Sequence, residues 1–312
     1  MKIKQICILG GGGFVGSHLT AQLAKTGVSI RIPGRRRIDL RHLDVLPTVT
    51  TVEADIHDPA HLENLFQDCD AVINLVGILH GSAAEFERVH AELPAKVVAA
   101  CRATGVRRLL HMSALGASTD SASLYQQSKA RGEAIVLAAN DLHPTVFRPS
   151  VIFGPDDSFL NLFAKLLSLT PALPLAGAKA RLQPIHINDV ARAFTLSLND
   201  PETWGQTYTL CGNTIYTLEE LVRLTASACN LKRFILPLGE GASYAMAMAM
   251  EFVPGPKMMT RDNWRALRTD NICSDAYPAC FGQPASLTAN LDYLRNEDSR
   301  SIYATYRIHA RR

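Results

Sequence analysis

A tyrosine and a lysine four positions apart, Tyr125 and Lys129, form the pattern in this sequence best suited to acid–base chemistry. If the segment is helical, residues i and i+4 share one face, so the phenol and the ammonium lie side by side. A neighbouring positive charge favours the phenolate and lowers the pKa of tyrosine from its usual value of about 10. Such a tyrosine can act as a general acid or base. Ser113, at the end of a predicted strand, is the candidate hydroxyl partner.

A run of glycines near the N-terminus, Gly10-Gly11-Gly12-Gly13-Phe14-Val15-Gly16, separates a predicted strand from a predicted helix. Glycines with this spacing permit a tight turn, close approach of a pyrophosphate to the backbone, and packing of the helix on the strand. The helix N-terminus then presents free N–H groups to the phosphates. A flexible turn without a ligand is the alternative. We expect a dinucleotide site whose cofactor contacts are Gly10, Gly13, Phe14, Val15 and Gly16.

The residues after the second predicted strand indicate which dinucleotide is preferred. NAD sites place an acidic residue near the end of this strand, where it holds the ribose 2′-hydroxyl. Here the strand runs instead into Pro33-Gly34-Arg35-Arg36-Arg37. Guanidinium groups pair with phosphate in a fork geometry, so Arg35 and Arg36 favour the 2′-phosphate of NADP(H). A solvated basic loop is one alternative, and Asp39 bending back to a 2′-hydroxyl, with NAD(H) as the cofactor, is another.

The elements that must position these residues alternate between short apolar runs and helical patterns, which is typical of βαβ units and a parallel sheet. The predicted strands cover residues 3–9, 28–32, 49–53, 71–76, 108–112 and 145–147. The predicted helices cover residues 19–26, 86–104 and 125–139, with a further helix that starts at Asp58-Pro59. Ligands bind at the carboxyl ends of the strands in such folds, so the glycine turn and Ser113 are expected at one edge of the sheet.

Prolines interrupt the pattern beyond Pro149, and the later elements are a helix at 189–198, a strand at 206–210 and a helix at 217–229. The last helix starts with a Thr-x-x-Glu capping box. We therefore expect a doubly wound α/β, Rossmann-like domain over residues 1–155, completed by 185–210. Residues 156–184 and 211–312 are expected to form a smaller C-terminal domain for a substrate or partner, laid over the carboxyl ends of the strands.

The composition excludes several classes of protein. The chain has 312 residues, 47% of them hydrophobic and 20% charged, with a net charge of +3, so it can bury a core and does not suggest a nucleic-acid binder. Seven cysteines include no C-x-x-C pair, which argues against a disulfide scaffold and a zinc site and favours a reducing compartment. Without a signal-type or membrane-spanning apolar run, the expected location is cytoplasmic, or peripheral at the inner face of a membrane.

Together these motifs resemble the short-chain dehydrogenase/reductase superfamily, in its extended or atypical branch of NAD-dependent epimerase/dehydratase type. The resemblance rests on their order, with Asp55-Ile56 after the third strand, Asn74-Leu75-Val76-Gly77 after the fourth and Ser113 after the fifth, followed by the Tyr125/Lys129 pair. Residues 148–155 are similar to the segment that lies along the nicotinamide in that superfamily. The resemblance implies further cofactor contacts at Asp55, Ile56, Leu75, Val76, Gly77, Lys129, Pro149 and Val151.

A narrower resemblance points to the nucleotide-binding accessory subunits of mitochondrial NADH:ubiquinone oxidoreductase, complex I, and their bacterial relatives. It is carried by residues 72–77, 110–115, 149–163 and 259–262. That family has an NADPH-binding Rossmann fold, and its mitochondrial members are regarded as structural. The catalytic Ser/Thr of extended enzymes often lies about two residues after the first serine, where this chain has Leu115. This departure puts the third member of the catalytic set in doubt.

Two functions follow from these patterns. In the first, the chain is an NADP(H)-dependent oxidoreductase, epimerase or dehydratase acting on a small molecule. Tyr125 is then the acid/base, Lys129 tunes it and grips the nicotinamide ribose, and Ser113 polarises a substrate oxygen. In the second, the chain is a non-catalytic, NADP(H)-loaded structural or assembly factor of a respiratory or quinone-related complex. The glycine turn supports both functions equally.

Two features outside these motifs are also interpreted. His80, His90, His111 and His186 lack ligand-type spacing and are taken as ordinary polar or strand-end residues, and no metal is expected. The Met-rich stretch 242–253 repeats apolar residues at helical spacing, and basic residues follow it. Its apolar face either packs on the core or forms an exposed patch for a membrane or a membrane complex. The residues concerned are Tyr244, Met248 and Phe252, followed by Lys257, Arg261, Arg265 and Arg268.

Overall fold

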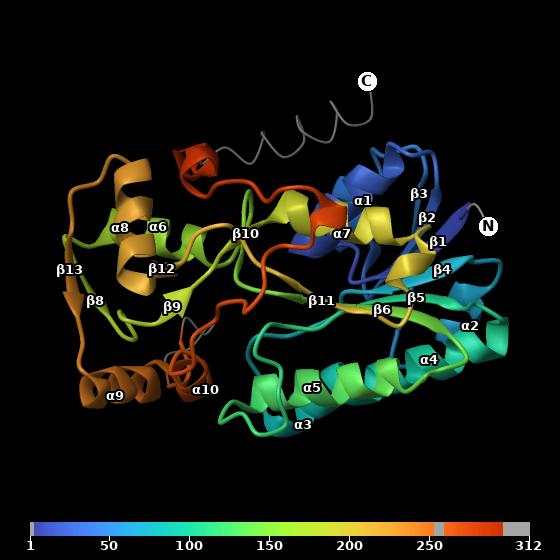
Figure 1. Cartoon of the computed structure of the whole chain (residues 1–312), viewed down its shortest axis with the longest axis horizontal. Coiled ribbons are helices and arrows are strands. Elements are labelled where there is room, and N and C mark those ends of the chain that lie inside the picture. The colour runs from blue at the N-terminus through green and yellow to red at the C-terminus, as the bar shows by residue number, and fades with distance from the viewer. Residues whose placement is uncertain (1–2, 253–258, 296–312) are drawn as a thin grey trace.

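A seven-stranded parallel sheet forms the centre of the molecule (Figure 1). The computed structural model describes residues 3–252 and 259–295. The strand order is β11-β6-β5-β4-β1-β2-β3, and every pairing in this sheet is parallel. The strands are β1 (Gln5–Leu9), β2 (Ser29–Gly34), β3 (Val49–Glu53), β4 (Ala71–Asn74), β5 (Arg108–Met112), β6 (His143–Pro149) and β11 (Thr207–Leu210). The predicted doubly wound α/β fold is confirmed.

Helices cover both faces of this sheet, which explains why its central strands β1, β4 and β5 are almost wholly buried. Along β1, Ile6 and Ile8 belong to one buried cluster, and Cys7 and Leu9 belong to the other. The helices on the first face are α1 (Phe14–Ala24) and α7 (Ile187–Ser197), and those on the second are α2 (Pro59–Phe66), α4 (Leu93–Thr104) and α5 (Leu124–Leu137) (Figure 1). The sheet therefore separates two hydrophobic cores.

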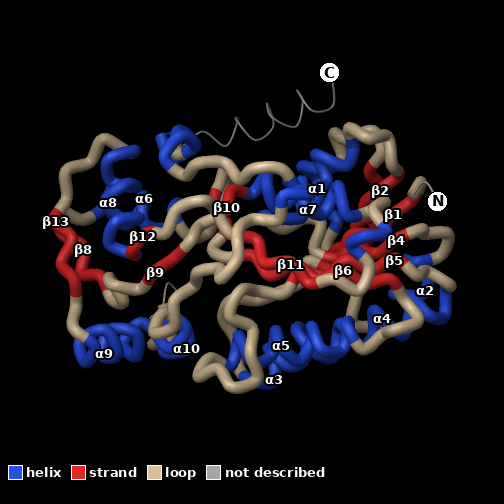
Figure 2. Tube along the Cα trace, viewed as in Figure 1, coloured by secondary structure: helices blue, strands red, loops and turns tan. Residues whose placement is uncertain are grey.

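A smaller lobe with its own core lies beside this sheet (Figure 2). Its helices are α6 (Leu160–Leu169), α8 (Leu218–Ala228), α9 (Glu240–Met250) and α10 (Arg261–Ala266). Its paired strands are β8 (Ala172–Leu175) with β13 (Phe234–Pro237), and β9 (Arg181–Leu182) with β12 (Tyr216–Thr217). A further pair, β7 (Ile152–Phe153) with β10 (Ile185–His186), lies between this lobe and the large sheet. No described helix is long and apolar enough to cross a lipid bilayer.

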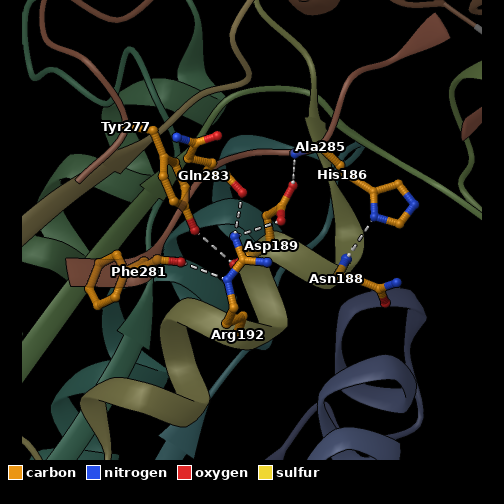
Figure 3. A network of polar contacts seen from close by, with 8 residues as sticks. All are labelled: His186, Asn188, Asp189, Arg192, Tyr277, Phe281, Gln283 and Ala285. Atoms are coloured by element: carbon orange, nitrogen blue, oxygen red, sulfur yellow. Dashed lines mark hydrogen bonds and ion pairs between the residues drawn. The ribbon is translucent and has the colours of Figure 1, made fainter. Parts of the chain in front are cut away.

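The chain returns from the small lobe to the large sheet, and a buried carboxylate on α7 fixes this return (Figure 3). Asp189 Oδ2 accepts a hydrogen bond of 2.8 Å from the Ala285 backbone N–H, and Asp189 Oδ1 lies 2.8 Å from Arg192 Nη2. Arg192 Nε in turn donates to the Phe281 carbonyl at 2.6 Å. Residues 281–285 are thereby held on the helix that covers the sheet.

One predicted helix is divided in the structure. The stretch predicted as a single helix over 86–104 consists of α3 (Ala83–Glu87), a π-helical turn η2 (Arg88–Glu92) and α4. The π turn brings the His90 carbonyl against α5, where a Cβ on Gly132 would overlap it. Such single π turns in longer helices are frequent at functional sites. The close approach of the two helices therefore depends on a glycine.

The cysteine analysis needs a correction. Cys211, directly after β11, forms a disulfide with Cys273, and the two residues are 62 positions apart. The five other cysteines form no disulfide. The absence of a local Cys pair argues against a disulfide scaffold, but spacing carries no information about a single bond between residues so far apart.

Gly132→Ala tests the packing of α5 on the π turn. Alanine normally stabilises a helix by about 0.5–1 kcal/mol over glycine. Here the added methyl group meets the His90 carbonyl, so we expect a loss of about 1–3 kcal/mol in the free energy of unfolding, measured in urea. Gly241→Ala in α9, where a Cβ meets no atom within 4 Å, is the matched control and should not destabilise. Equal effects of the two substitutions would refute the close approach.

Candidate functional site

The glycine turn joins β1 to α1 and has no room for side chains at two of its positions. Gly10 has φ +80, and a Cβ there would lie 3.2 Å from the Val76 backbone nitrogen. A Cβ on Gly16 would overlap the Gly10 carbonyl. The Gly13 N–H donates to Gly10 O at 3.1 Å, and Gly13 then caps α1. The turn thus places the N-terminus of α1 directly beside the end of β4, as a dinucleotide cradle requires.

The basic residues after β2 lie on the surface at the same edge of the sheet. Arg35, Arg36 and Arg37 are exposed. Arg36 Nε and Nη2 donate to the two carboxylate oxygens of Asp39 at 3.0 and 2.9 Å. The residue that could hold a 2′-hydroxyl is therefore paired with one of the residues that could hold a 2′-phosphate. Asp55 is exposed, and its carboxylate accepts the His57 N–H at 2.9 Å.

The chain after β4 runs close to α5, the helix that carries Tyr125 and Lys129. Leu75 is buried and donates its N–H to Leu9 O, and the Val76 N–H donates to Asn74 Oδ1 at 3.2 Å. A Cβ on Gly77 would lie 3.5 Å from His90 Nε2 and 3.9 Å from Lys129 Nζ. The structure therefore brings Gly77 and Lys129 together.

Lys129 is 3% exposed on α5, and its Nζ donates to the Met112 carbonyl at 2.6 Å. Burial lowers the pKa of Lys129 to about 8, although Glu133 acts in the opposite direction. Tyr125 lies on the same helix, edge-on to the ring of His90. Burial raises the pKa of Tyr125 to about 12. The expected lowering of this pKa by the neighbouring ammonium is therefore wrong for the protein without ligand, because desolvation of the phenolate dominates.

Ser113 follows β5 and is held between β5 and β6, since its N–H donates to Phe147 O at 2.7 Å. Its hydroxyl is buried and has no hydrogen-bond partner among the described residues. Buried hydroxyl groups are almost always satisfied, so an unpaired one at this edge suits a ligand oxygen. Leu115 cannot serve as a second hydroxyl, and its N–H donates to Pro149 O at 2.9 Å.

A buried histidine, His90, connects the chain after β4 to α5, a role that the sequence did not predict. The Ile78 N–H donates to His90 Nε2 at 3.0 Å, so the ring proton resides on Nδ1. Nδ1 then donates to Ser128 Oγ at 2.8 Å, and this hydroxyl donates to the Tyr125 carbonyl at 2.8 Å. Burial, with a smaller effect of Lys129, lowers the pKa of His90 to about 3, so the ring is neutral. The position of His90 depends on the π turn, and the spacing of residues in the sequence does not predict that turn.

A second unpredicted contact holds α5 from its other side. Glu133, one turn after Lys129, is buried and accepts hydrogen bonds from Arg148 Nε on β6 at 3.0 and 2.9 Å. A carboxylate and a guanidinium in this geometry form one of the stronger charge-assisted pairs.

The site residues fall into two groups in space. The first group lies around the N-terminal half of α5 and contains Gly77, Ser113, Tyr125 and Lys129. Pro149 is joined to this group because its carbonyl accepts the Leu115 N–H. A second group lies at the ends of β1, β2 and β3. It contains the glycine turn, Arg35, Arg36, Asp55 and Ile56. Val151 lies beyond β6, where its carbonyl accepts the Ile185 N–H at 2.9 Å. No cluster that could hold a metal ion occurs among the described residues.

Comparison with known proteins identifies the family. The model of the NAD dependent epimerase/dehydratase family matches residues 6–211. The chain is 31% identical over 69% of its length to the mitochondrial NADH dehydrogenase (ubiquinone) 1 alpha subcomplex subunit 9 of Dictyostelium discoideum. The matched region spans 61% of that relative. Identity to the protein of the same name in Arabidopsis thaliana is 30% over 86% of this chain and 70% of that protein.

Two further similarities concern an enzyme and a solved structure. The chain is 32% identical to a ceramide reductase of Caulobacter vibrioides over 63% of its own length and 61% of that protein. A nucleoside-diphosphate-sugar epimerase from Staphylococcus aureus has the same fold, with a TM-score of 0.73 and 18% identity over 92% of this chain and 99% of that one. The region matched by the family model contains the glycine turn, the Tyr125/Lys129 helix and almost all of the parallel sheet. The chain belongs to the NAD dependent epimerase/dehydratase family.

Proposed function

We propose that this protein is an NADP(H)-binding oxidoreductase, epimerase or dehydratase that acts on a small molecule. The observation that carries the proposal is the buried Lys129 ammonium beside Gly77, with the unpaired Ser113 hydroxyl on the next strand end. A buried lysine and an unsatisfied buried hydroxyl are costly, and such groups gather at functional sites. The family and the relative named ceramide reductase support an enzyme.

The described residues fit a nicotinamide dinucleotide. Gly10 and Gly16 keep the turn tight, because a Cβ at either position would crowd backbone atoms of the protein. Gly13 leads into α1, whose first N–H groups would bind the phosphates. Lys129 would hold the hydroxyls of the nicotinamide ribose, and Gly77 would border them. When bound, the nicotinamide supplies or accepts a hydride. Ser113 Oγ would donate a hydrogen bond to a substrate oxygen, and the Tyr125 hydroxyl would give a proton to that oxygen or take one from it.

A second function is favoured by two observations. The Dictyostelium and Arabidopsis relatives are named as subunits of NADH dehydrogenase. On α9, Ser243 and Ala247 are buried, whereas Met248 is 41% exposed, and Phe252, just after the helix, is 82% exposed. Tyr244 packs edge-on against Trp264, so one part of the predicted apolar face is covered and the other is open. Val253 and Lys257 lie outside the described residues. The alternative is therefore an NADP(H)-loaded subunit or assembly factor that uses this open part of α9, peripheral to a membrane.

Replacing Arg35, Arg36 and Arg37 with alanine together tests the preference for NADP(H). Loss of charge-assisted pairs to a 2′-phosphate should weaken NADPH binding by about 100-fold, or 2.7 kcal/mol, and NADH binding little, by titration calorimetry. Arg41→Ala, an exposed arginine on the neighbouring turn, is the control. Equal losses for both nucleotides, or tighter NADH binding by the native protein, would assign the site to NAD(H).

The Tyr125→Phe variant distinguishes binding of the cofactor from catalysis of hydride transfer. The ring remains and only the ionisable hydroxyl is lost, so the affinity for NADPH should change by less than about tenfold. The rate of hydride transfer should fall by about 10²–10⁴-fold, because a positioned general acid or base accelerates a reaction by that factor. Stopped-flow absorbance of the nicotinamide measures the rate. An unchanged rate would remove Tyr125 from the mechanism.

Lys129→Met tests whether the ammonium is desolvated. The pKa of Lys129 is about 8 in the folded protein, against 10.5 for a free lysine. The unfolded chain therefore binds more protons than the folded protein between these two pH values. Stability from this group therefore increases as the pH rises through that window. In urea unfolding, the free energy of unfolding of the wild type relative to the variant should increase by about 2 kcal/mol from about pH 7.5 to about pH 10. Lys165→Met, at an exposed position on α6, should show no such change. A pH-independent difference for Lys129→Met would mean that water reaches the ammonium.

A further inference from the structure

The N-terminus of α5 is capped by a residue of the small lobe. Asp262, on α10, accepts hydrogen bonds from the Leu124 N–H at 2.7 Å and the Tyr125 N–H at 3.3 Å. Its Oδ2 also accepts from Ser123 Oγ at 2.7 Å, and that same hydroxyl oxygen receives the Gln126 N–H. The first three N–H groups of α5 are therefore satisfied, two of them by a carboxylate 137 or 138 residues away in the chain.

This distant cap matters because of where Tyr125 lies. It is the second residue of α5, and the first turn of a helix frays when its N–H groups lack partners. The first turn of α5 contains no acidic residue of its own. A carboxylate at this end is also favoured by the helix dipole. Ser123, the residue before α5, accepts the third N–H of the helix, and Asp262 supplies acceptors for the first two from another lobe.

Asp262 is itself firmly placed. Thr260 and Asn263 form a reciprocal capping box around the start of α10. The Arg261 N–H and Nε donate to the Glu251 carboxylate at 2.7 and 2.8 Å, which joins α10 to the end of α9. The ring of Trp264 packs against Tyr244 of α9. The position of the carboxylate is therefore set by the small lobe.

The same stretch of chain is attached to the site at a second point. Asn271 Oδ1 accepts from Ser150 Oγ at 2.6 Å, and Asn271 Nδ2 donates to the Leu115 carbonyl at 3.3 Å. These contacts join it to the loops after β6 and β5. Residues 260–273 therefore extend from the start of α5 to the strand ends that carry Ser113 and Pro149.

We propose that Asp262 is a positioning residue, which fixes the first turn of α5 and so makes the geometry of Tyr125 and Lys129 depend on the small lobe. This inference rests on the proposed function, because it assigns to Asp262 an effect on the nicotinamide half of the cofactor. The adenine half is expected at the glycine turn and Arg35, which form no hydrogen bond or ion pair with Asp262 among the described residues. The two halves of the cofactor should consequently respond differently to loss of the carboxylate.

The test compares Asp262→Ala and Asp262→Asn with Asp270→Asn. Asp270 lies in the same stretch and forms an exposed ion pair with Arg181 at 3.5 Å, so its substitution removes a charge without touching α5. Titration calorimetry with NADPH reports on the whole cofactor, and titration with adenosine 2′,5′-bisphosphate reports on the adenine half alone. Hydrogen exchange of the amides of residues 124–128 in the ligand-free protein reports on the first turn directly.

We expect Asp262→Ala to weaken NADPH binding by about tenfold, the size of effect that a lost helix cap produces. Binding of adenosine 2′,5′-bisphosphate should stay within about twofold, and exchange at residues 124–128 should accelerate by about tenfold. Asp262→Asn keeps one acceptor oxygen and should lie between the alanine variant and the wild type. Asp270→Asn should match the wild type in all three measurements.

Three results would overturn the inference: unchanged NADPH binding in a folded Asp262→Ala protein, equal losses for both ligands, or unchanged exchange at residues 124–128. Failure of the proposed function looks different. The wild type itself then binds neither NADPH nor NADH, while hydrogen exchange still decides whether Asp262 holds the first turn of α5.

Discussion

Burial of the Lys129 ammonium is the constraint on which the rest of the site depends. An ammonium has three donors, and among the described residues Met112 O is the only acceptor that Lys129 reaches. Taking such a charge out of water costs several kcal/mol unless partners replace the lost hydration. The charge is buried at the point where β4, β5 and α5 meet. Two donors therefore remain for a ligand, and ligand hydroxyls would offset part of the cost.

The helix that carries this lysine is held by contacts from several separate elements. Gly132 lets α5 lie against the π turn, and His90 ties Ser128 to the chain after β4. Glu133 joins α5 to β6 through Arg148, and Asp262 caps its first turn. These contacts fix the rotation and the height of one helix, and through that helix the places of two reacting groups.

The sequence predicts the parts of this architecture that depend on local pattern. The alternation of apolar runs and helices predicts the sheet, and the spacing of Gly10, Gly13 and Gly16 predicts the turn. An i, i+4 relation is enough to place Tyr125 and Lys129 on one helix face. Each of these features is determined within one turn or one βαβ unit, so neighbouring residues contain the information.

The features that the sequence analysis missed are long-range. Asp262 lies 137 residues from Tyr125, and the partners of the Cys211–Cys273 disulfide are separated by 62 positions. His90 appeared ordinary because its role arises from a π turn and from the approach of a second helix. The pKa of Tyr125 was misjudged because local spacing reveals the nearby charge and not the burial, which dominates. Tertiary packing thus decides the electrostatics around the candidate residues that the sequence predicts.

The central claim is that the glycine turn and α5 together form a site for one nicotinamide dinucleotide, and native mass spectrometry of the purified protein tests it most directly. The account predicts a single bound NADP(H) or NAD(H) per chain, either co-purified or taken up on addition, and its loss when Gly16 is replaced by valine in protein that remains folded. A wild-type protein that binds neither nucleotide under these conditions would contradict the account.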